Sequence, residues 1–409
     1  MPQPSDRQSA ERVVRRLRKE GFEALLAGGC VRDMLLGLPS DDFDVATSAS
    51  PEQINRLFRR VLMVGAKFGV AMVMLGKCKV EVTTFRSDMD YADGRRPERV
   101  VFSTPQADAR RRDFTINGMF YDPLEEKVID YVGGQEDLSK GIIRTIGDPD
   151  QRFGEDYLRM LRAVRFSVRF DFPIEPDTAA AVRRHAPKIA TISGERILDE
   201  MTKMLARDSA VDSLRLMAEL GLAGPIIPEL FDRDKLWERA VARVESLQDH
   251  RDAELALAGL LCELDGDTIE EITRRWGGSN QQRDKIRWIA GLRDEWREAP
   301  DWPLHRLKKV LAHDAFGRLA AIWRHEEQAT EGSTRRVDRV EQRIGNIDPS
   351  QIQPEPLVTG RDLIDLGVRP GPEMGEILDE LYDSQLDEEL TTRDDALAAA
   401  RKLINRKHA

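Results

Sequence analysis

Residues 28–47, GGCVRDMLLGLPSDDFDVAT, combine two glycines, an Arg-Asp pair and an Asp-x-Asp pattern directly after the apolar run ALLA. A strand that ends at Gly28 and Gly29 can turn tightly and let its backbone approach a ligand closely. The helix expected next, CVRDMLLG, would point its first amide groups at an anion, and Arg32 beside Asp33 would add a guanidinium suited to phosphate oxygens. The segment therefore predicts a phosphate-binding turn. The alternative is a plain turn, which glycine marks in most folds.

The end of this segment, DDFDVAT, has the alternating pattern of a strand. Asp42 and Asp44 would share one face, while Phe43 and Val45 would turn toward the core. Two carboxylates on one face repel each other, and a divalent cation relieves that repulsion; Mg²⁺ favours such oxygen ligands together with substrate phosphates. The pattern predicts a Mg²⁺ site at Asp42 and Asp44. The alternative is an exposed acidic strand end that also includes Asp41.

A third carboxylate follows in the alternating strand pattern KVEVTTF. Glu81 would face away from Val80 and Val82, which turn toward the core. Glu81 is therefore either a further catalytic acid beside the Asp pair or a surface residue.

The glycine turn, the Asp-x-Asp pattern and a later strand acid resemble the signature of the nucleotidyltransferase superfamily related to DNA polymerase β. A narrower similarity is to bacterial class II CCA-adding enzymes and their sister poly(A) polymerases, and it covers residues 10–230 strongly and the rest weakly. Five ordered segments carry it: LLAGGCVRDMLLGLPSDDFDVATSASPEQINRLF, VEVTTFRSDMDYADGRRP, RRRDFTINGMFYD, IDYVGGQEDLSKGIIRTIGDPDQRFGEDYLRMLRAVRF and SGERILDEM. This resemblance implies a head, neck, body and tail.

The resemblance also implies roles for residues beyond the Asp pair. Arg111 and Arg112 match the family's Arg-Arg motif, which implies contacts to the triphosphate and ribose of a nucleotide, and Asn117 completes that motif. Residues 86–98, RSDMDYADGRRPE, are rich in Asp and Gly and predict a mobile loop. They match the family's flexible loop, which is associated with adding A after C, so an enzyme that adds only C is disfavoured.

The segment GEDYLRMLRAVRF has helical periodicity, with an apolar arc and a charged side. Charged residues spaced by three wind along that side: Asp156, Arg159, Arg162 and Arg165. A solvated face with intrahelical ion pairs is the alternative. Because Asp accepts hydrogen bonds and Arg only donates them, an Asp-Arg pair suits the pairing edges of cytosine and adenine and rejects uracil and guanine. The resemblance implies that Asp156 and Arg159 form this template, supported by Glu155, and that Arg162 and Arg165 contact the nucleotide or its triphosphate.

Strand and helix patterns divide the chain into parts. Up to about residue 145, a helical segment and several short strand patterns predict an α+β head with a mixed sheet and flanking helices. After residue 150 the strand patterns vanish, and all-helical structure is expected to the end. Breaks near 225 and 350, together with the resemblance, predict four parts. These are a catalytic nucleotidyltransferase head (1–145), a neck of nucleotide-templating helices (146–225), a helical RNA-binding body (226–350) and a helical RNA-binding tail (351–409).

Composition indicates a folded protein of the cytoplasm. The 409 residues are 33% charged and 41% hydrophobic, as in globular proteins, and neither a signal sequence nor an apolar stretch of about 20 residues is present, so no membrane partner is expected. The net charge of −10 argues against nucleic-acid binding over the whole surface, but 63 Lys and Arg residues allow a local basic groove. Cys30, Cys78 and Cys262 have no disulfide or zinc spacing and are expected to be buried, without a disulfide partner.

Taken together, the site and the resemblance predict a template-independent RNA nucleotidyltransferase. It would add C and A to the 3′ end of tRNA from CTP and ATP and release pyrophosphate, with Asp42 and Asp44 holding Mg²⁺ in a two-metal mechanism. One alternative is a bacterial poly(A) polymerase, which shares most head and neck motifs but typically carries a long basic C-terminal extension. The other is a tRNA nucleotidyltransferase that adds only A.

Overall fold

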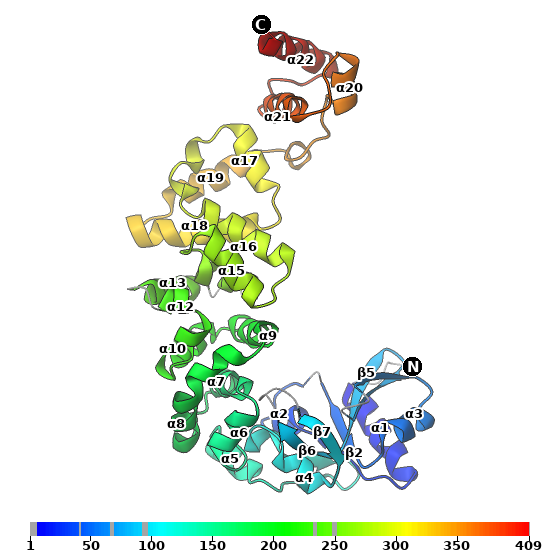
Figure 1. Ribbon diagram of the computed structural model, residues 1–409. Helices are drawn as coiled ribbons and strands as arrows, with labels where there is room; N and C mark the ends of the chain where they lie inside the picture. Colours follow the sequence, from blue (N-terminus) through cyan, green and yellow to red (C-terminus); the bar gives the residue numbers. More distant parts are fainter. Residues whose placement is uncertain are drawn as a thin grey trace. The chain divides into compact units, whose positions relative to one another are not determined.

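The computed structural model describes residues 6–40, 42–65, 69–91, 97–231, 235–247 and 252–408 (Figure 1). Asp41 therefore lies outside the described residues. The chain forms two compact units, Met1–Asp234 and Lys235–Ala409. A sheet with flanking helices begins the first unit, and the described part of the second is built from helices.

The first unit is built on a mixed seven-stranded sheet with the strand order β3-β4-β5-β2-β1-β8-β9. Only β2 and β5 run parallel to each other, while the other neighbours are antiparallel. The predicted α+β head is thereby confirmed. The strands are β1 (Ala24–Ala27), β2 (Asp44–Thr47), β3 (Val61–Gly65), β4 (Val70–Leu75), β5 (Cys78–Thr84), β8 (Phe120–Asp122) and β9 (Lys127–Ile129).

The helices of the first unit flank this sheet and continue beyond it (Figure 1). One helix start is seen in detail: Ser50 Oγ accepts from the amide of Gln53 at 3.3 Å, and the Gln53 side chain accepts from the Ser50 amide at 2.7 Å. These two bonds form a capping box before α3. The helices are α1 (Asp6–Lys19), α2 (Gly29–Leu35), α3 (Pro51–Leu57), α4 (Pro105–Arg110), η2 (Thr115–Asn117), α5 (Gly134–Lys140), α6 (Pro149–Glu155), α7 (Leu158–Phe170), α8 (Pro176–His185), η3 (Ala186–Thr191), α9 (Gly194–Leu205), α10 (Ala210–Glu219), α11 (Ala223–Ile226) and α12 (Pro228–Phe231).

The two faces of the sheet are covered differently. On one face, strand residues including Leu26, Val45 and Val82 are buried in the main core with residues of α1 and α3. On the other face, a smaller cluster holds Ala46 and Phe120 together with a residue of α4. Because side chains alternate along a strand, the neighbours of Val45 and Val82 turn to this less covered face, where a ligand site has room to form.

The predicted continuous helix over GEDYLRMLRAVRF is interrupted, so this part of the prediction was wrong. Asp156 has an extended backbone (φ −157°, ψ 103°) and ends α6, while α7 begins at Leu158. Its carboxylate accepts from the Leu158 amide at 3.1 Å, an interaction that Asp makes at helix starts rather than in helix interiors. The three arginines of the expected ladder do share α7, but Asp156 does not.

The predicted mobile loop at residues 86–98 also differs from the structure. It contains β6 (Arg86–Tyr91) and the start of β7 (Pro97–Phe102), which pair as an antiparallel two-stranded sheet, while residues 92–96 lie outside the described part. Strand β6 pairs with β7, whose last residues, VVF (100–102), follow the predicted loop. A prediction confined to the polar segment missed that partner.

The second unit contains only helical elements among its described residues, as predicted. Its core includes the fully buried Trp276, Trp296 and Trp323 and a separate apolar cluster formed by α20 to α22. Cys262 is buried there, Cys30 is buried in the first unit, and Cys78 is only partly buried. The helices are α13 (Leu236–Ser246), α14 (Ala253–Leu261), α15 (Gly266–Arg275), α16 (Asn280–Leu292), η5 (Glu295–Arg297), η6 (Ala299–Asp301), α17 (Leu304–Leu311), α18 (Phe316–Glu331), α19 (Arg335–Gly345), η7 (Pro349–Gln351), α20 (Gly360–Asp365), α21 (Pro372–Leu386) and α22 (Arg393–His408).

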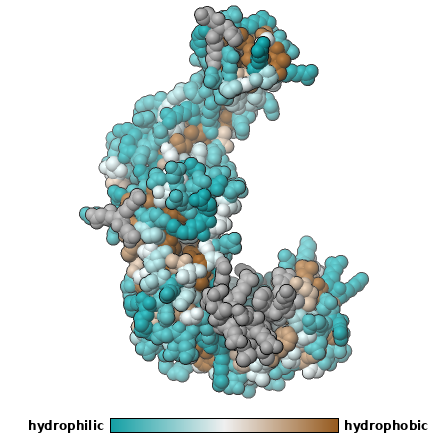
Figure 2. All heavy atoms as spheres, in the orientation of Figure 1, coloured by the Kyte–Doolittle hydropathy of each residue, from teal (hydrophilic) through white to brown (hydrophobic). Residues whose placement is uncertain are grey.

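The visible surface is mostly hydrophilic, with apolar side chains in small patches (Figure 2). No helix that the structure describes combines the length and the apolar character needed to cross a membrane.

Candidate active site

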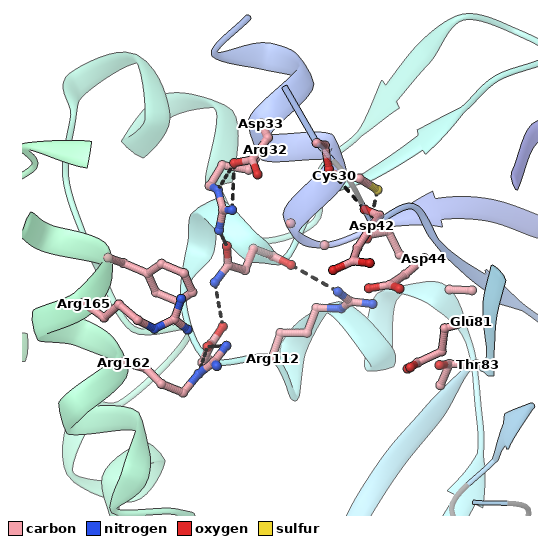
Figure 3. Close-up of a pocket in the computed structure, with 18 of the residues that line it drawn as sticks. Cys30, Arg32, Asp33, Asp42, Asp44, Glu81, Thr83, Arg112, Arg162 and Arg165 are labelled. Carbon is pink, nitrogen blue, oxygen red and sulfur yellow. Dashed lines mark hydrogen bonds and ion pairs between the residues drawn. The ribbon is translucent and has the colours of Figure 1, made fainter. Parts of the chain in front are cut away.

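Every residue singled out for chemistry from the sequence lines one cavity of about 770 Å³ in the first unit (Figure 3). The cavity lies between the sheet of the head and the helices α7 and α9, so it brings together groups that are far apart in the chain. These residues are Gly28, Gly29, Arg32, Asp33, Asp42, Asp44, Glu81, Arg111, Arg112, Asn117, Asp156, Arg159, Arg162 and Arg165.

The pairing of β1 with β2 places the glycine turn beside the Asp pair. Ala27, the last residue of β1, lies opposite Asp44, the first residue of β2. Gly28 has φ +77°, a conformation that other residues rarely adopt. A Cβ at this position would lie 2.6 Å from Nη1 of Arg112. The turn therefore needs glycine both for its backbone conformation and for the close approach of that arginine.

The parallel pairing of β2 with β5 adds the third carboxylate. Val45 pairs with Val82, so Asp44 and Glu81, one residue earlier on each strand, lie next to each other. Both valines are fully buried in the main core, and alternation turns the two acids to the cavity. Figure 3 shows Asp42, Asp44 and Glu81 around one space, with the guanidinium of Arg112 pointing toward it.

These carboxylates repel one another. Burial and, after it, the negative charge of Glu81 raise the pKa of Asp44 to about 6, and Arg112 opposes this shift more than Asp42 adds to it. Among the described residues, no three His, Cys, Asp or Glu side chains gather closely enough to hold a metal ion. Two repelling carboxylates nevertheless fit Mg²⁺, which proteins often bind through one or two carboxylates plus substrate phosphates. Asp42 and Asp44 are the residues that would hold it.

The Arg111-Arg112 pair is held by a buried acid that sequence analysis missed. Asp108, 1% exposed, accepts from Nε of Arg111 at 2.8 Å and from Nη2 of Arg112 at 3.1 Å. Burial opposes ionisation of Asp108, but the charges of Arg112 and Arg111 outweigh it and lower its pKa. The two guanidiniums are thus fixed at the cavity wall. The sequence signal was the Asp-x-x-Arg-Arg spacing within α4 and its end.

Arg32 and Asn117 belong to a chain of polar contacts across the cavity floor. Arg32 donates to Asp33 at 2.8 Å and to the Asn117 side-chain oxygen at 2.5 Å. The Asn117 amide nitrogen in turn donates to Asp113 at 3.0 Å, and Arg162 donates to the other oxygen of Asp113 at 2.8 Å. Although burial opposes it, the charge of Arg162 lowers the pKa of Asp113 well below its usual range. This chain fixes Arg32 and Arg162 relative to each other.

The arginines of α7 face this cavity and not solvent. Arg165 donates to Glu200 at 2.6 Å, and Arg162 reaches the same carboxylate at 3.4 Å. Glu200, on α9, is only 2% exposed. Both guanidiniums also lie over the ring of Phe166, at 5.2 Å for Arg162 and 4.4 Å for Arg165. The alternative of a solvated charged face is therefore wrong for these residues.

Asp156 and Arg159 lie on the same cavity wall but have separate partners. Asp156 accepts from both Nη atoms of Arg196 on α9, at 3.1 and 2.7 Å. Arg159, 8% exposed, donates to Glu155 at 2.6 Å, as expected from the sequence, and to a backbone oxygen of Arg152 at 2.9 Å. Each member of the predicted template is thus held in place by a different charged residue.

Sequence reasoning missed the residues that hold these groups. Arg196 and Glu200 occur in SGERILDEM, a motif noted only for its resemblance, and their four-residue spacing on a helix was the available signal. Arg169 and Arg207 also line the cavity. Their charge was visible in the sequence, but their position depends on how α7 and α9 pack.

Three family models match successive segments of the chain. The model of the poly A polymerase head domain matches residues 24–144, and a model for an RNA- and SrmB-binding site of polymerase A matches residues 171–233. A model of tRNA nucleotidyltransferase domain 2 matches residues 248–400. The CCA-adding enzyme of Geobacillus kaustophilus is 35% identical over 97% of this chain and 96% of its own length. The chain belongs to the CCA-adding enzyme family.

This family member also resembles a solved structure along its whole length. The crystal structure of the Bacillus stearothermophilus CCA-adding enzyme in complex with CTP matches with a TM-score of 0.80 and 29% identity, over 99% of this chain and 98% of that chain. Poly(A) polymerase I of Salmonella typhi is 39% identical, but only over 60% of this chain and 56% of its own length. The similarity to CCA-adding enzymes thus covers nearly the whole chain, whereas the match to the polymerase covers 60% of it.

Proposed function

We propose that this chain adds C and A to the 3′ end of tRNA, using CTP and ATP and releasing pyrophosphate. The observation that carries the proposal is the single cavity in which a repelling acid pair faces a wall of arginines. The full-length relation to CCA-adding enzymes supports the choice of tRNA as the acceptor. A soluble, cytoplasmic enzyme stays the expectation from the sequence.

In the proposed reaction, the terminal 3′-hydroxyl oxygen of the RNA bonds to the α-phosphorus of the nucleotide while the bond from that phosphorus to the bridging oxygen breaks. Pyrophosphate leaves and the hydroxyl proton passes to solvent. Because the RNA hydroxyl is itself the nucleophile, no protein nucleophile is needed. Asp42 and Asp44 would hold Mg²⁺, and Glu81 adds negative charge beside them. When bound, Mg²⁺ would lower the pKa of the attacking hydroxyl and neutralise charge on the phosphates.

Binding of the triphosphate is assigned to the arginines around this acid pair. Arg112 points toward the carboxylates (Figure 3), where it can meet the phosphates that share the metal. Arg32 uses part of its five N–H groups on Asp33 and Asn117, which leaves others for an oxygen anion. The Gly28-Gly29 turn lets the backbone come close to the same phosphates. Arg111, Arg162 and Arg165 complete the basic wall.

Choice of the base is assigned to Asp156 and Arg159. The Asp carboxylate would accept from the exocyclic amino group of cytosine or adenine, and the Arg guanidinium would donate to the adjacent ring nitrogen. Their fixed partners support this role: Arg196 orients the carboxylate, and Glu155 orients the guanidinium. Uracil and guanine would place an acceptor against Asp156 and a donor against Arg159, and buried unpaired groups of this kind are costly.

A second candidate is poly(A) synthesis, which is supported by the 39% identity to poly(A) polymerase I over 60% of the chain. Addition of A alone is a third.

In the four-part division proposed from the sequence, the body (226–350) and the tail (351–409) bind RNA. We propose that these parts hold the acceptor arm of tRNA largely by shape and phosphate contacts, as is usual for double-stranded RNA.

One experiment separates these activities. The protein is incubated with Mg²⁺, all four nucleoside triphosphates and tRNAs ending at position 73, 74 or 75, and the 3′ ends of the products are sequenced. Completion of CCA on all three substrates is the expected result. Extended A tails would favour a poly(A) polymerase, and extension of only the tRNA ending at C75 would favour an enzyme that adds A alone. Asp42→Ala is the inactive control.

A further inference from the structure

We propose that Arg169 and Arg207 form a subsite for the terminal phosphate of the nucleoside triphosphate, and for the pyrophosphate that later leaves. The subsite deepens the proposed function and rests on it. Both side chains line the same cavity as the acid pair and the arginines of α7. Neither was expected from the sequence to contact a nucleotide.

The position of Arg169 follows from the direction of α7. Arg159, Arg162, Arg165 and Arg169 all lie on this helix and all line the cavity. With a rise of 1.5 Å per residue, the backbone positions of Arg159 and Arg169 are separated by about 15 Å along the axis. A nucleotide whose base meets Arg159 can therefore direct its phosphates along α7, past Arg162 and Arg165, toward the last turn of the helix.

Arg207 brings a second positive charge to that end. It follows α9, is exposed, and forms no ion pair with a carboxylate that the structure describes. Arg165 is paired with Glu200 at 2.6 Å, and Arg169 reaches Asp33 at 3.3 Å. The positive charge of Arg165, Arg169 and Arg207 thus exceeds the negative charge of their partners Glu200 and Asp33.

The arginines are close enough to repel one another. Although the residue as a whole is exposed, partial desolvation of its guanidinium lowers the pKa of Arg207. The positive charges of Arg169 and Arg165 lower it further, and the negative charge of Asp33 opposes them. An anion placed between them would relieve this repulsion, and guanidiniums form strong charge-assisted hydrogen bonds with phosphate.

The terminal phosphate fits this place better than an RNA phosphate does. The RNA 3′-hydroxyl must reach the α-phosphate beside Asp42 and Asp44, which belong to the strand β2 side of the cavity. Arg169 and Arg207 belong instead to the ends of α7 and α9, beyond Arg165 in the direction of the triphosphate. Pyrophosphate is a compact anion with several negative charges, so cationic groups at this end of the site would stabilise it as it forms.

The test compares the full-length Arg207→Ala protein with wild type in equilibrium binding of CTP and CMP, in Mg²⁺ and without tRNA. The variant should bind CTP about fivefold to tenfold more weakly, the loss expected for one charge-assisted contact. Its affinity for CMP, which lacks the β- and γ-phosphates, should not change. The inhibition constant of inorganic pyrophosphate in the CTP incorporation assay should rise by a similar factor, and Arg207→Lys should recover part of both losses.

Arg15→Ala is the matched control, because Arg15 is an exposed arginine of α1 that does not line the cavity. Unchanged CTP binding and pyrophosphate inhibition in Arg207→Ala would overturn the subsite while leaving the proposed function intact. A higher KM for tRNA with unchanged CTP affinity would also overturn it and assign Arg207 to an RNA phosphate. Wild-type protein that binds neither CTP nor ATP would remove the proposed function and the subsite together.

Discussion

Replacing Asp44 by Asn is expected to stabilise the metal-free protein while abolishing nucleotide transfer. Folding raises the pKa of Asp44 from 3.8 to about 6, mainly through burial and then through Glu81. The folded state therefore holds this proton more tightly than the unfolded state, so the free energy of unfolding falls as pH rises from about 4 to above 6. The change corresponds to about 3 kcal/mol at most, and partial exposure of the side chain reduces it.

Asn cannot ionise and so avoids this loss. In urea unfolding with EDTA at pH 7.5, Asp44→Asn should be about 1 to 3 kcal/mol more stable than wild type, and the difference should nearly vanish at pH 4. Added Mg²⁺ should stabilise wild type more than the variant, because only wild type retains both carboxylates. Glu125→Gln, which removes an exposed carboxylate from the turn between β8 and β9, is the control for a general charge effect.

Three results would refute this reasoning. Equal stability of Asp44→Asn and wild type at pH 7.5 would show that the carboxylate is not destabilised by its surroundings. A difference that persists unchanged at pH 4 would show that ionisation is not its cause. Normal incorporation of CTP by the variant would exclude Asp44 as a required metal ligand.

Four further variants test the geometry of the site. Gly28→Ala should lower stability by about 2 kcal/mol and also slow transfer, since its Cβ would lie 2.6 Å from Nη1 of Arg112; unfolding curves and single-turnover rates check this, and an unchanged rate would contradict it. Arg159→Met and Arg196→Met should each raise incorporation of U and G relative to C and A more than they slow transfer, measured by competition among the four nucleotides; an unchanged preference would argue against the template. Glu200→Gln should reduce the free energy of unfolding by about 2 kcal/mol, because a buried partner of two arginines loses its charge, and no change in the unfolding midpoint would contradict that role.

Local sequence patterns determined much of the candidate site. Alternation along one strand was enough to place Asp44 on the face opposite Val45, and the same rule separated Glu81 from its valine neighbours. Asp42 also lines the cavity, but β2 begins at Asp44, so the strand predicted to carry both acids carries only Asp44. Short-range chemistry also fixed the capping box at the start of α3. These features depend on residues a few positions apart, so neither their spacing nor their orientation needs the rest of the fold.

Only the tertiary structure decided which charges meet. Asp156 leaves the helix of Arg159 and pairs with Arg196, 40 residues later in the chain. Arg162 likewise shares its charge between Asp113 and the buried Glu200. Ion pairs between distant segments arise from how α7, α9 and the head pack. A sequence pattern reports the charge of each partner but not the packing that brings the partners within hydrogen-bonding distance.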